Sequence, residues 1–184
     1  MSESMEKRGN AGSFIGFYFQ ALTGILGSPG QFFSEFSRET GFWKPFGCLI
    51  MSSLFFTLAG LTQVHENQAL MAGILFLNAV SMPFITAGTA YMVMTMTIGK
   101  GVTFVRLFSG VAFAAAITLL ASWIPLFVWL TEPWKWALIL IWMVKGCGLR
   151  WMQAILIAGI SAFVLVLFFW SLGSVISCVR GFIL

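Results

Sequence analysis

The sequence predicts an all-α, polytopic helical membrane protein with five transmembrane helices, preceded by one or two interfacial amphipathic helices. The first observation is composition: 59% of the 184 residues are hydrophobic and 9% are charged, whereas soluble domains carry roughly 25% charged residues. The second is the alternation of long apolar stretches with short polar turns. The third is that basic residues concentrate in every second turn, as expected of a chain that crosses a membrane repeatedly.

The predicted domain organisation has three parts. Residues 1–12 form a disordered cytoplasmic tail, residues 13–44 form interfacial amphipathic helices, and residues 45–184 form one membrane domain. Because a bilayer core needs about 20 helical residues, spans are expected at about residues 45–63, 69–98, 104–130, 134–146 and 151–179. The fourth segment is short, so it must borrow turn residues or cross only partly. The second can tilt, kink at Pro83 or project beyond the bilayer.

The apolar stretch from Phe14 to Leu26 follows Lys7 and Arg8, as in a signal peptide. Its polar and small residues, however, fall on one helical face and its large apolar residues on the other. No clean small-x-small cleavage site follows. We therefore expect a retained helix that lies in the membrane interface.

A second short helix is expected to begin at Pro29, because Ser28 can cap it and proline suits the first helical position. Glu35 and Arg38 make this helix too charged to cross a membrane. Its aromatic side is predicted to be a surface for a partner or for lipid, formed by Phe32, Phe33 and Phe36.

The orientation follows from the basic residues around the turn Gly99–Arg106. With five spans, one side of the membrane receives eight cations and the other receives only Lys135 and Arg180. The eight are Lys7, Arg8, Arg38, Lys44, Lys100, Arg106, Lys145 and Arg150. The positive-inside rule then predicts a cytoplasmic N-terminus and a C-terminus outside.

Two sets of residues within the spans are candidate sites. Polar and small residues fall on one face of the second span, at Asn78, Ser81, Gly88 and Thr95. They suit hydrogen bonds between helices, and alternatively a polar pathway. Small residues four apart predict close helix packing, within this chain rather than between chains; these are Gly110, Ala114, Ala154, Ala158 and Ala162.

Residues that carry enzymatic or metal chemistry are not grouped in this sequence. The three cysteines are far apart, and the only histidine, His65, lies beside Glu66 in a predicted turn. We expect buried, inert thiols, no cofactor, no metal site and no enzymatic activity. The cations are dispersed among apolar stretches, so no nucleic-acid partner is expected.

Four short motifs occur in a fixed order, at Ile25–Phe33, Gly99–Phe104, Ala121–Pro125 and Gly148–Arg150. Over about residues 20–178 this order resembles the Yip1-domain family of five-span membrane proteins. The resemblance implies a non-enzymatic integral membrane protein. Eukaryotic members bind small GTPases and act in vesicle traffic, but their Asp-Leu-x-Gly-Pro motif is absent here. That difference argues against a GTPase partner and favours a prokaryotic member in the cytoplasmic membrane.

Two functions are therefore expected as alternatives. The first is a membrane scaffold or accessory subunit that binds membrane lipid, a membrane-protein partner or a second copy of the chain. The second is a small channel or transporter with a polar pathway along the second span. An intramembrane enzyme is disfavoured, because no nucleophile–base pair is present.

Overall fold

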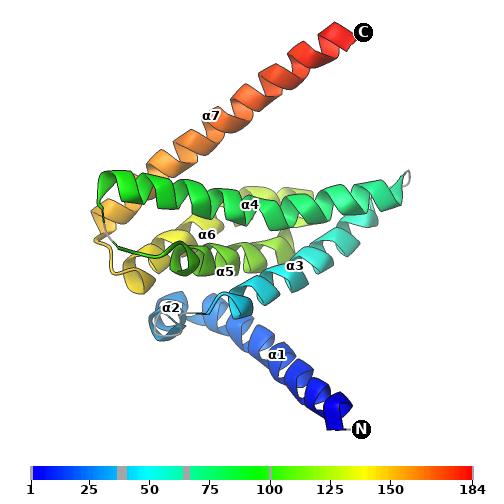
Figure 1. Cartoon of the computed structure of the whole chain (residues 1–184), viewed down its shortest axis with the longest axis vertical. Helices are drawn as coiled ribbons and strands as arrows, with labels where there is room; N and C mark the ends of the chain where they lie inside the picture. Colours follow the sequence, from blue (N-terminus) through cyan, green and yellow to red (C-terminus); the bar gives the residue numbers. More distant parts are fainter. Residues whose placement is uncertain (1, 37–40, 64–66, 100, 184) are drawn as a thin grey trace.

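The structure is a computed structural model that describes residues 2–36, 41–63, 67–99 and 101–183. All regular elements within these ranges are helical (Figure 1). In chain order they are α1 (Ser2–Gly27), α2 (Pro29–Phe36), α3 (Trp43–Leu61), α4 (Gln68–Thr97), α5 (Phe104–Ser122), the 3-10 helix η1 (Pro125–Phe127), α6 (Val128–Ile141), the π-helix η2 (Trp142–Gly146) and α7 (Trp151–Ile183).

Helix α5 is the centre of the bundle. Every residue from Leu107 to Thr118 is buried, and α5 contacts α3, α4, α6 and η2. Its sequence explains this position, because small residues allow neighbouring helices to approach closely; they are Ser109, Gly110, Ala112, Ala114, Ala115 and Ala116. The small residues predicted to pack within the chain at Gly110 and Ala114 thus lie in the core.

The turn after α5 comes earlier than predicted. We expected a third span over residues 104–130 and a fourth from residue 134, but α5 ends at Ser122 and α6 begins at Val128. Pro125 lacks an amide hydrogen and disfavours helical geometry at the residue before it. Pro133, by contrast, lies inside α6. The fourth apolar segment therefore includes residues 128–133, which we had assigned to the third span and the turn.

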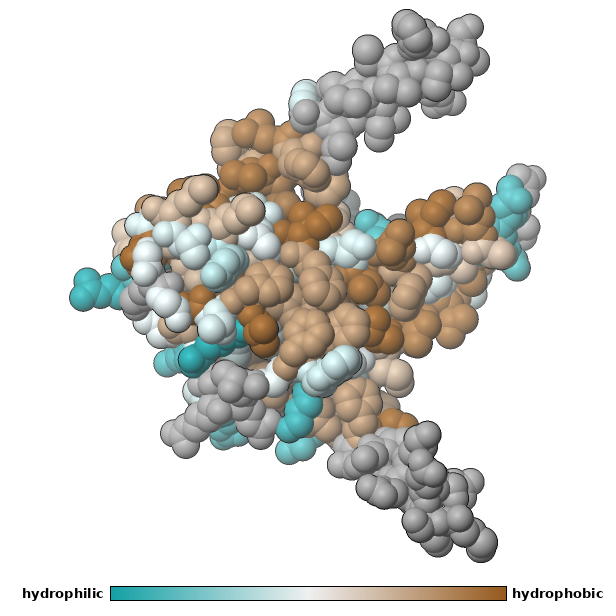
Figure 2. Space-filling view, viewed as in Figure 1, coloured by the Kyte–Doolittle hydropathy of each residue, from teal (hydrophilic) through white to brown (hydrophobic). Residues whose placement is uncertain are grey.

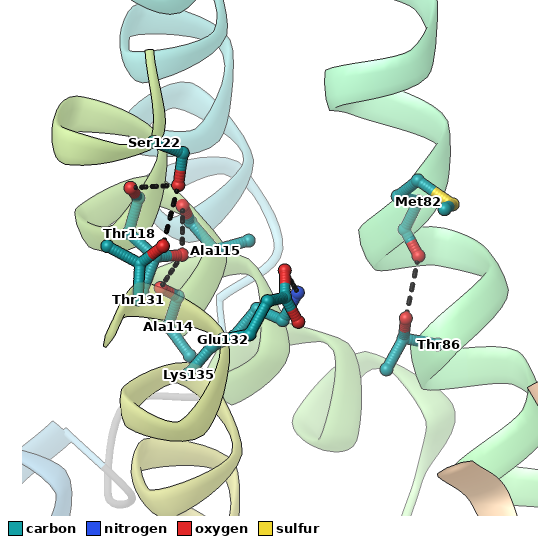
Figure 3. A network of polar contacts seen from close by, with 9 residues as sticks. All are labelled: Met82, Thr86, Ala114, Ala115, Thr118, Ser122, Thr131, Glu132 and Lys135. Atoms are coloured by element: carbon teal, nitrogen blue, oxygen red, sulfur yellow. Dashed lines mark hydrogen bonds and ion pairs between the residues drawn. The ribbon is translucent and has the colours of Figure 1, made fainter. Parts of the chain in front are cut away.

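Helix α6 runs antiparallel to α5, as two hydrogen bonds show. At one end Ser122 Oγ lies 3.1 Å from Thr131 Oγ1 (Figure 3). At the other end Trp142 Nε1 donates to the Arg106 carbonyl oxygen over 3.0 Å. Consequently α6 and η2 together return the chain to the level at which α5 begins.

Four helices within the described ranges are long and apolar enough to cross a membrane. They are α3, α4, α5 and the Trp151–Trp170 part of α7. Helix α6 alone has 14 residues and is not among them. The length and composition of these helices thus indicate a membrane domain with several spans. A fifth crossing stays a prediction.

Helix α4 extends well beyond the level at which α3 begins. At the start of α3, Phe42 stacks on Phe108 of α5 with centroids 5.2 Å apart, and Phe84 of α4 stacks on the same ring at 4.3 Å. Helix α4 continues from Phe84 to Thr97, thirteen residues further. At 1.5 Å per residue this extension is about 20 Å long. Pro83 lies inside α4 without ending it.

Helices α1 and α2 form a hairpin against the bundle. The Phe14 ring lies on Gly47 of α3, where an added Cβ would come within 2.6 Å of the ring. Nearby, Tyr18 Oη and Ser52 Oγ are 2.8 Å apart and share a buried hydrogen bond. In Figure 1 the N-terminal part of α1 (blue) and the C-terminal part of α7 (red) extend from the bundle on opposite sides. Helix α1 begins at Ser2, within the expected tail, and the three-part division of the chain stays a prediction.

Candidate functional site

The aromatic side of α2 packs into the bundle. Phe33 lies edge-on to Trp142 of η2 with centroids 5.3 Å apart, and Phe36 lies edge-on to Phe113 of α5 at 4.8 Å. Phe32 also contacts Phe113, at 5.5 Å. We call these five residues the aromatic junction. It joins α2 to α5 and η2, and its edge-to-face pairs hold the rings in defined positions.

This arrangement corrects the prediction that Phe32, Phe33 and Phe36 form an exposed surface. Phe33 is 0% exposed and Phe36 is 6% exposed, while Phe32 is partly buried against the same core. The amphipathic pattern identified the correct side of α2, but that side is covered by this chain's own α5 and η2. A partner therefore cannot reach Phe33 or Phe36 while α2 is docked.

Two glycines make room for the indole of Trp142. A Cβ added at Gly110 would overlap the indole ring, and one at Gly146 would come within 2.5 Å of it. The ring is 1% exposed and is oriented by its hydrogen bond to the Arg106 carbonyl oxygen. Short π-helices frequently occur at functional sites, and here η2 carries both Trp142 and Gly146.

Gly110 could be identified from the sequence, but the Trp142 ring that packs on it could not. Gly110 was expected to receive another helix backbone, whereas it receives the Trp142 side chain. The available signal was the four-residue spacing of Trp142 and Gly146, which places them on one helical face. Phe113 gave no such signal, because its neighbours are uniformly apolar.

A pocket of about 500 Å³ opens between α1, α2 and the start of α3; we call it the hairpin pocket. Its apolar wall consists of Phe17, Gly24, Phe32 and Phe36. Its polar rim consists of Gln20, Ser28, Gln31, Glu35 and Lys44. Figure 2 shows hydrophilic residues beside hydrophobic ones on this lower face of the molecule. Among the residues that the structure describes, the pocket therefore combines aromatic surface with the side chains of Glu35 and Lys44.

Charges in the hairpin pocket are held close to its aromatic wall. The Lys44 ammonium lies over the Phe17 ring, 5.1 Å from its centroid, and cation–π attraction contributes about 0.5–1 kcal/mol at an exposed site. Within the described ranges the Glu35 carboxylate makes no ion pair or hydrogen bond. Both charged side chains thus line the pocket, with the Lys44 ammonium on the Phe17 ring.

The predicted polar face of α4 points away from the core of the helical bundle. Asn78 and Thr95 are exposed, and Ser81 and Gly88 are partly exposed. The buried face of α4 is a different one, formed by Ala79, Pro83, Ala87, Ala90, Val93 and Met94. The Thr95 hydroxyl donates a hydrogen bond to the Met92 carbonyl oxygen of its own helix. The Thr86 hydroxyl donates to the Met82 carbonyl oxygen in the same way (Figure 3). These two hydroxyls are satisfied within their own helix.

The small residues of α7 pack within the chain. Ala154 is 0% exposed, Ala158 is 6% exposed, and Ala162 is partly buried. Helix α7 contacts α4, α6 and η2. These alanines thus lie on a helix that contacts neighbouring helices of the same molecule, and a close backbone approach along this face stays a prediction.

Cys147 lies between η2 and α7, and its thiol is a weak acid. Burial raises its pKa to about 11, although the nearby Arg106 guanidinium acts in the opposite direction. The thiol is therefore protonated at neutral pH, and only the thiolate is a nucleophile. No group of three potential metal ligands occurs within the described ranges; His65 and Glu66 lie outside them.

Comparison with known families identifies the family of this chain. A model of the Yip1 domain family matches residues 23–173. The chain belongs to the Yip1-domain family. The match begins in α1, ends in α7 and contains the whole aromatic junction. Together with four helices of membrane-spanning length, it makes this Yip1-domain protein a multi-pass membrane protein.

The family match is the positive result of these comparisons. Neither the curated proteins nor the solved structures contain a match to this Yip1-domain chain.

Proposed function

We propose that this Yip1-domain protein is a non-enzymatic membrane scaffold or accessory subunit that binds a membrane-protein partner through the outer side of α1. The observation that carries this proposal is an outer stripe of large apolar residues. Ile15 is 48% exposed, and Phe19 and Leu26 are each 60% exposed. Their spacing of four and seven places them on one helical face, while Tyr18, Ala21 and Ile25 on another face are buried.

Helix lengths support an interfacial position for this stripe. The first 20 residues of α4, from Gln68 to Ala87, suffice to cross the bilayer core. They end within one turn of Phe84, the level at which α3 begins. Trp43 is 78% exposed there, as expected of an aromatic anchor at the membrane surface. Because Phe17 of α1 lies beside Lys44, α1 meets the bundle at this same surface.

We also infer five crossings, with the N-terminus in the cytoplasm and the C-terminus outside. Support comes from the antiparallel course of α6 and η2, which returns Trp142 to the level of Arg106. The basic turns at residues 99–106 and 145–150 then lie on one side, in agreement with the positive-inside rule. This placement suits a prokaryotic cytoplasmic membrane.

Reporter fusions test this topology. A reporter that is active only outside the cytoplasm is expected to be active after Phe127 and silent after Gly101 and Arg150. If α6 does not cross, the fusions after Phe127 and Arg150 will have the same activity, and the five-span topology will be wrong. Replacing Lys145 and Arg150 by glutamine in the Arg150 fusion provides the control for positive-inside retention.

Partner binding is tested with a photo-cross-linking amino acid at position 19 of the full-length protein in native membranes. We expect one discrete protein adduct, and a loss of about tenfold or more when Ile15 and Leu26 are both replaced by serine. The reason is that full burial of each such side chain contributes about 1.5–3 kcal/mol. Leu77→Ser, an exposed position on α4, is the matched control and should leave the adduct unchanged. Lipid adducts alone would contradict partner binding.

The channel alternative is not carried forward. Its polar pathway required Asn78, Ser81, Gly88 and Thr95 to face other helices, but Asn78 and Thr95 are exposed on the outside of α4. A small GTPase partner is not proposed either, because the family motif associated with it is absent from the sequence.

A further inference from the structure

We infer that the partner contacts the outer stripe of α1 inside the cytoplasmic leaflet, through a transmembrane helix of its own. This inference rests on the proposed function, because it specifies the class of partner for the stripe of Ile15, Phe19 and Leu26. It excludes a peripheral protein that binds from the cytoplasm. The depth at which α1 packs on the bundle and the direction of the stripe both point to such a contact.

Helix α5 provides a measure of depth in the membrane. It has 19 residues, and at 1.5 Å per residue it is about 29 Å long. The hydrocarbon core of a bilayer is about 30 Å thick. Because α5 is just long enough to cross this core, it must cross with little tilt. Distance along α5 is therefore close to depth below the cytoplasmic surface.

Helix α1 packs against the middle of α5. A small cavity between the two helices has an α5 wall of Phe113, Ala116 and Ile117. Its α1 wall consists of Tyr18, Ala21, Leu22 and Ile25. Phe113 and Ile117 lie nine and thirteen residues after Phe104, hence about 14 and 20 Å from the cytoplasmic end of α5. Measured from Phe108, the level at which α3 begins, they are about 8 and 14 Å deep.

Helix α3 gives a similar depth. Ser52 lies nine residues after Trp43, so it is about 14 Å along α3 from the start of the helix. Its hydroxyl shares the buried hydrogen bond with Tyr18 of α1 over 2.8 Å. Helices that lie on a membrane are buried by only about 5–10 Å. The packed side of α1 therefore extends below the headgroups into the acyl chains.

The outer stripe faces away from the membrane surface. Gly24 lines the hairpin pocket together with Lys44, which follows the exposed Trp43 at that surface. Gly24 and Phe19 are five residues apart, so at about 100° per residue their directions on α1 differ by about 140°. The side of α1 that carries Gly24 thus lies towards the surface, and the stripe that carries Phe19 points into the leaflet.

The side chains around the stripe suit an apolar environment. Thr23 is exposed, but its hydroxyl donates to the Phe19 carbonyl oxygen over 3.0 Å. Polar groups in hydrocarbon must be satisfied internally, and this one is satisfied within α1. Between Phe14 and Leu26 the sequence contains no Asp, Glu, Lys, Arg or His. The surface that complements this stripe is therefore an apolar helix packed side by side with α1, as in a membrane.

Photoreactive lipids test the depth of the stripe in the purified full chain. The protein is reconstituted into vesicles of phosphatidylethanolamine and phosphatidylglycerol. They also contain a little phosphatidylcholine with a diazirine either in the middle of an acyl chain or in the headgroup. Two exposed residues of α4 serve as references: Leu77 lies in the middle of the span from Gln68 to Ala87, and Met96 lies nine residues beyond Ala87.

We expect Phe19 to be labelled in the same way as Leu77. Its ratio of acyl-probe to headgroup-probe labelling should exceed that of Met96 by about threefold or more, because the stripe lies below the boundary of about 5–10 Å that surface helices reach. Tandem mass spectrometry locates the labels. A ratio for Phe19 equal to that of Met96 would place the stripe at the surface and overturn the inference.

The photo-cross-linking amino acid at position 19 tests the class of partner. We expect the cross-linked peptide of the partner to lie in an apolar segment of about 20 residues, the length that crosses a bilayer. The same amino acid at position 20 is the matched control, because Gln20 is also exposed but lines the hairpin pocket. Position 20 should not give this adduct.

The outcomes separate this inference from the proposed function. A cross-linked peptide from a water-soluble domain would overturn the inference and leave the partner surface on α1 standing. Acyl-chain labelling of Phe19 without any protein adduct would remove the proposed partner, and the inference with it.

Discussion

Phe33→Ala is expected to lower the free energy of unfolding by about 3 kcal/mol, the lower end of the range for buried phenylalanine. The Phe33 ring is 0% exposed and packs edge-on against Trp142, so its removal leaves a cavity between α2 and η2. The lower end applies because part of the released surface would face lipid rather than water. Thermal unfolding of the purified protein in mild detergent measures the loss.

Gln31→Ala is the control for this prediction. Gln31 belongs to the same helix but is exposed, and surface substitutions usually change stability by less than about 0.5 kcal/mol. If the two variants unfold at the same temperature, α2 is not docked on the bundle in solution. Because Gln31 also lines the hairpin pocket, the comparison should be made without added lipid.

Gly110→Ala is expected to destabilise the protein by about 1–3 kcal/mol, although alanine is the better helix former. The added methyl group would overlap the Trp142 indole. To accommodate it, the indole must move, which breaks its hydrogen bond to the Arg106 carbonyl oxygen and disturbs the Phe33 contact. The unfolding temperature should therefore fall.

A double variant distinguishes this collision from a general intolerance of α5. Trp142→Leu removes the ring that the methyl group meets, so Gly110→Ala should cost much less in that background than alone. Gly88→Ala provides the matched control, because an added Cβ at Gly88 meets no atom within 4 Å. Additive effects of Gly110→Ala and Trp142→Leu would contradict the proposed contact.

Hydrophobic patterning predicted the helices of this protein well where a local signal marks their ends. Helix α2 begins at Pro29 as expected, and α3 and α4 begin and end within two residues of the predicted spans. The turn after α5 was predicted at the wrong position because the sequence contains two prolines, Pro125 and Pro133, at which a turn could form. Pro125 interrupts the helix, while the more polar sequence around Pro133, including the Glu132–Lys135 ion pair, is helical.

The tertiary role of each helix face could not be predicted in the same way. Periodicity shows that Phe32, Phe33 and Phe36 share one side of α2, but it does not say whether lipid, a partner or the chain itself covers that side. Periodicity likewise showed that polar and small residues share one side of α4, but it did not show what that side faces. The rings of α2 are covered by Phe113 and by Trp142, and Trp142 lies 109 residues after Phe33. Such distant pairings leave no trace in local spacing.

That separation has a consequence for biogenesis. The ribosome completes α2 long before it makes Phe113 and Trp142, to which the α2 rings bind. At about 5–20 residues per second, the 109 residues between Phe33 and Trp142 take about 5–20 s to synthesise. Throughout that interval Phe33 lacks the Trp142 ring against which it packs. Complete docking of α2 is therefore a late event of folding, because it requires a chain that has been synthesised as far as η2.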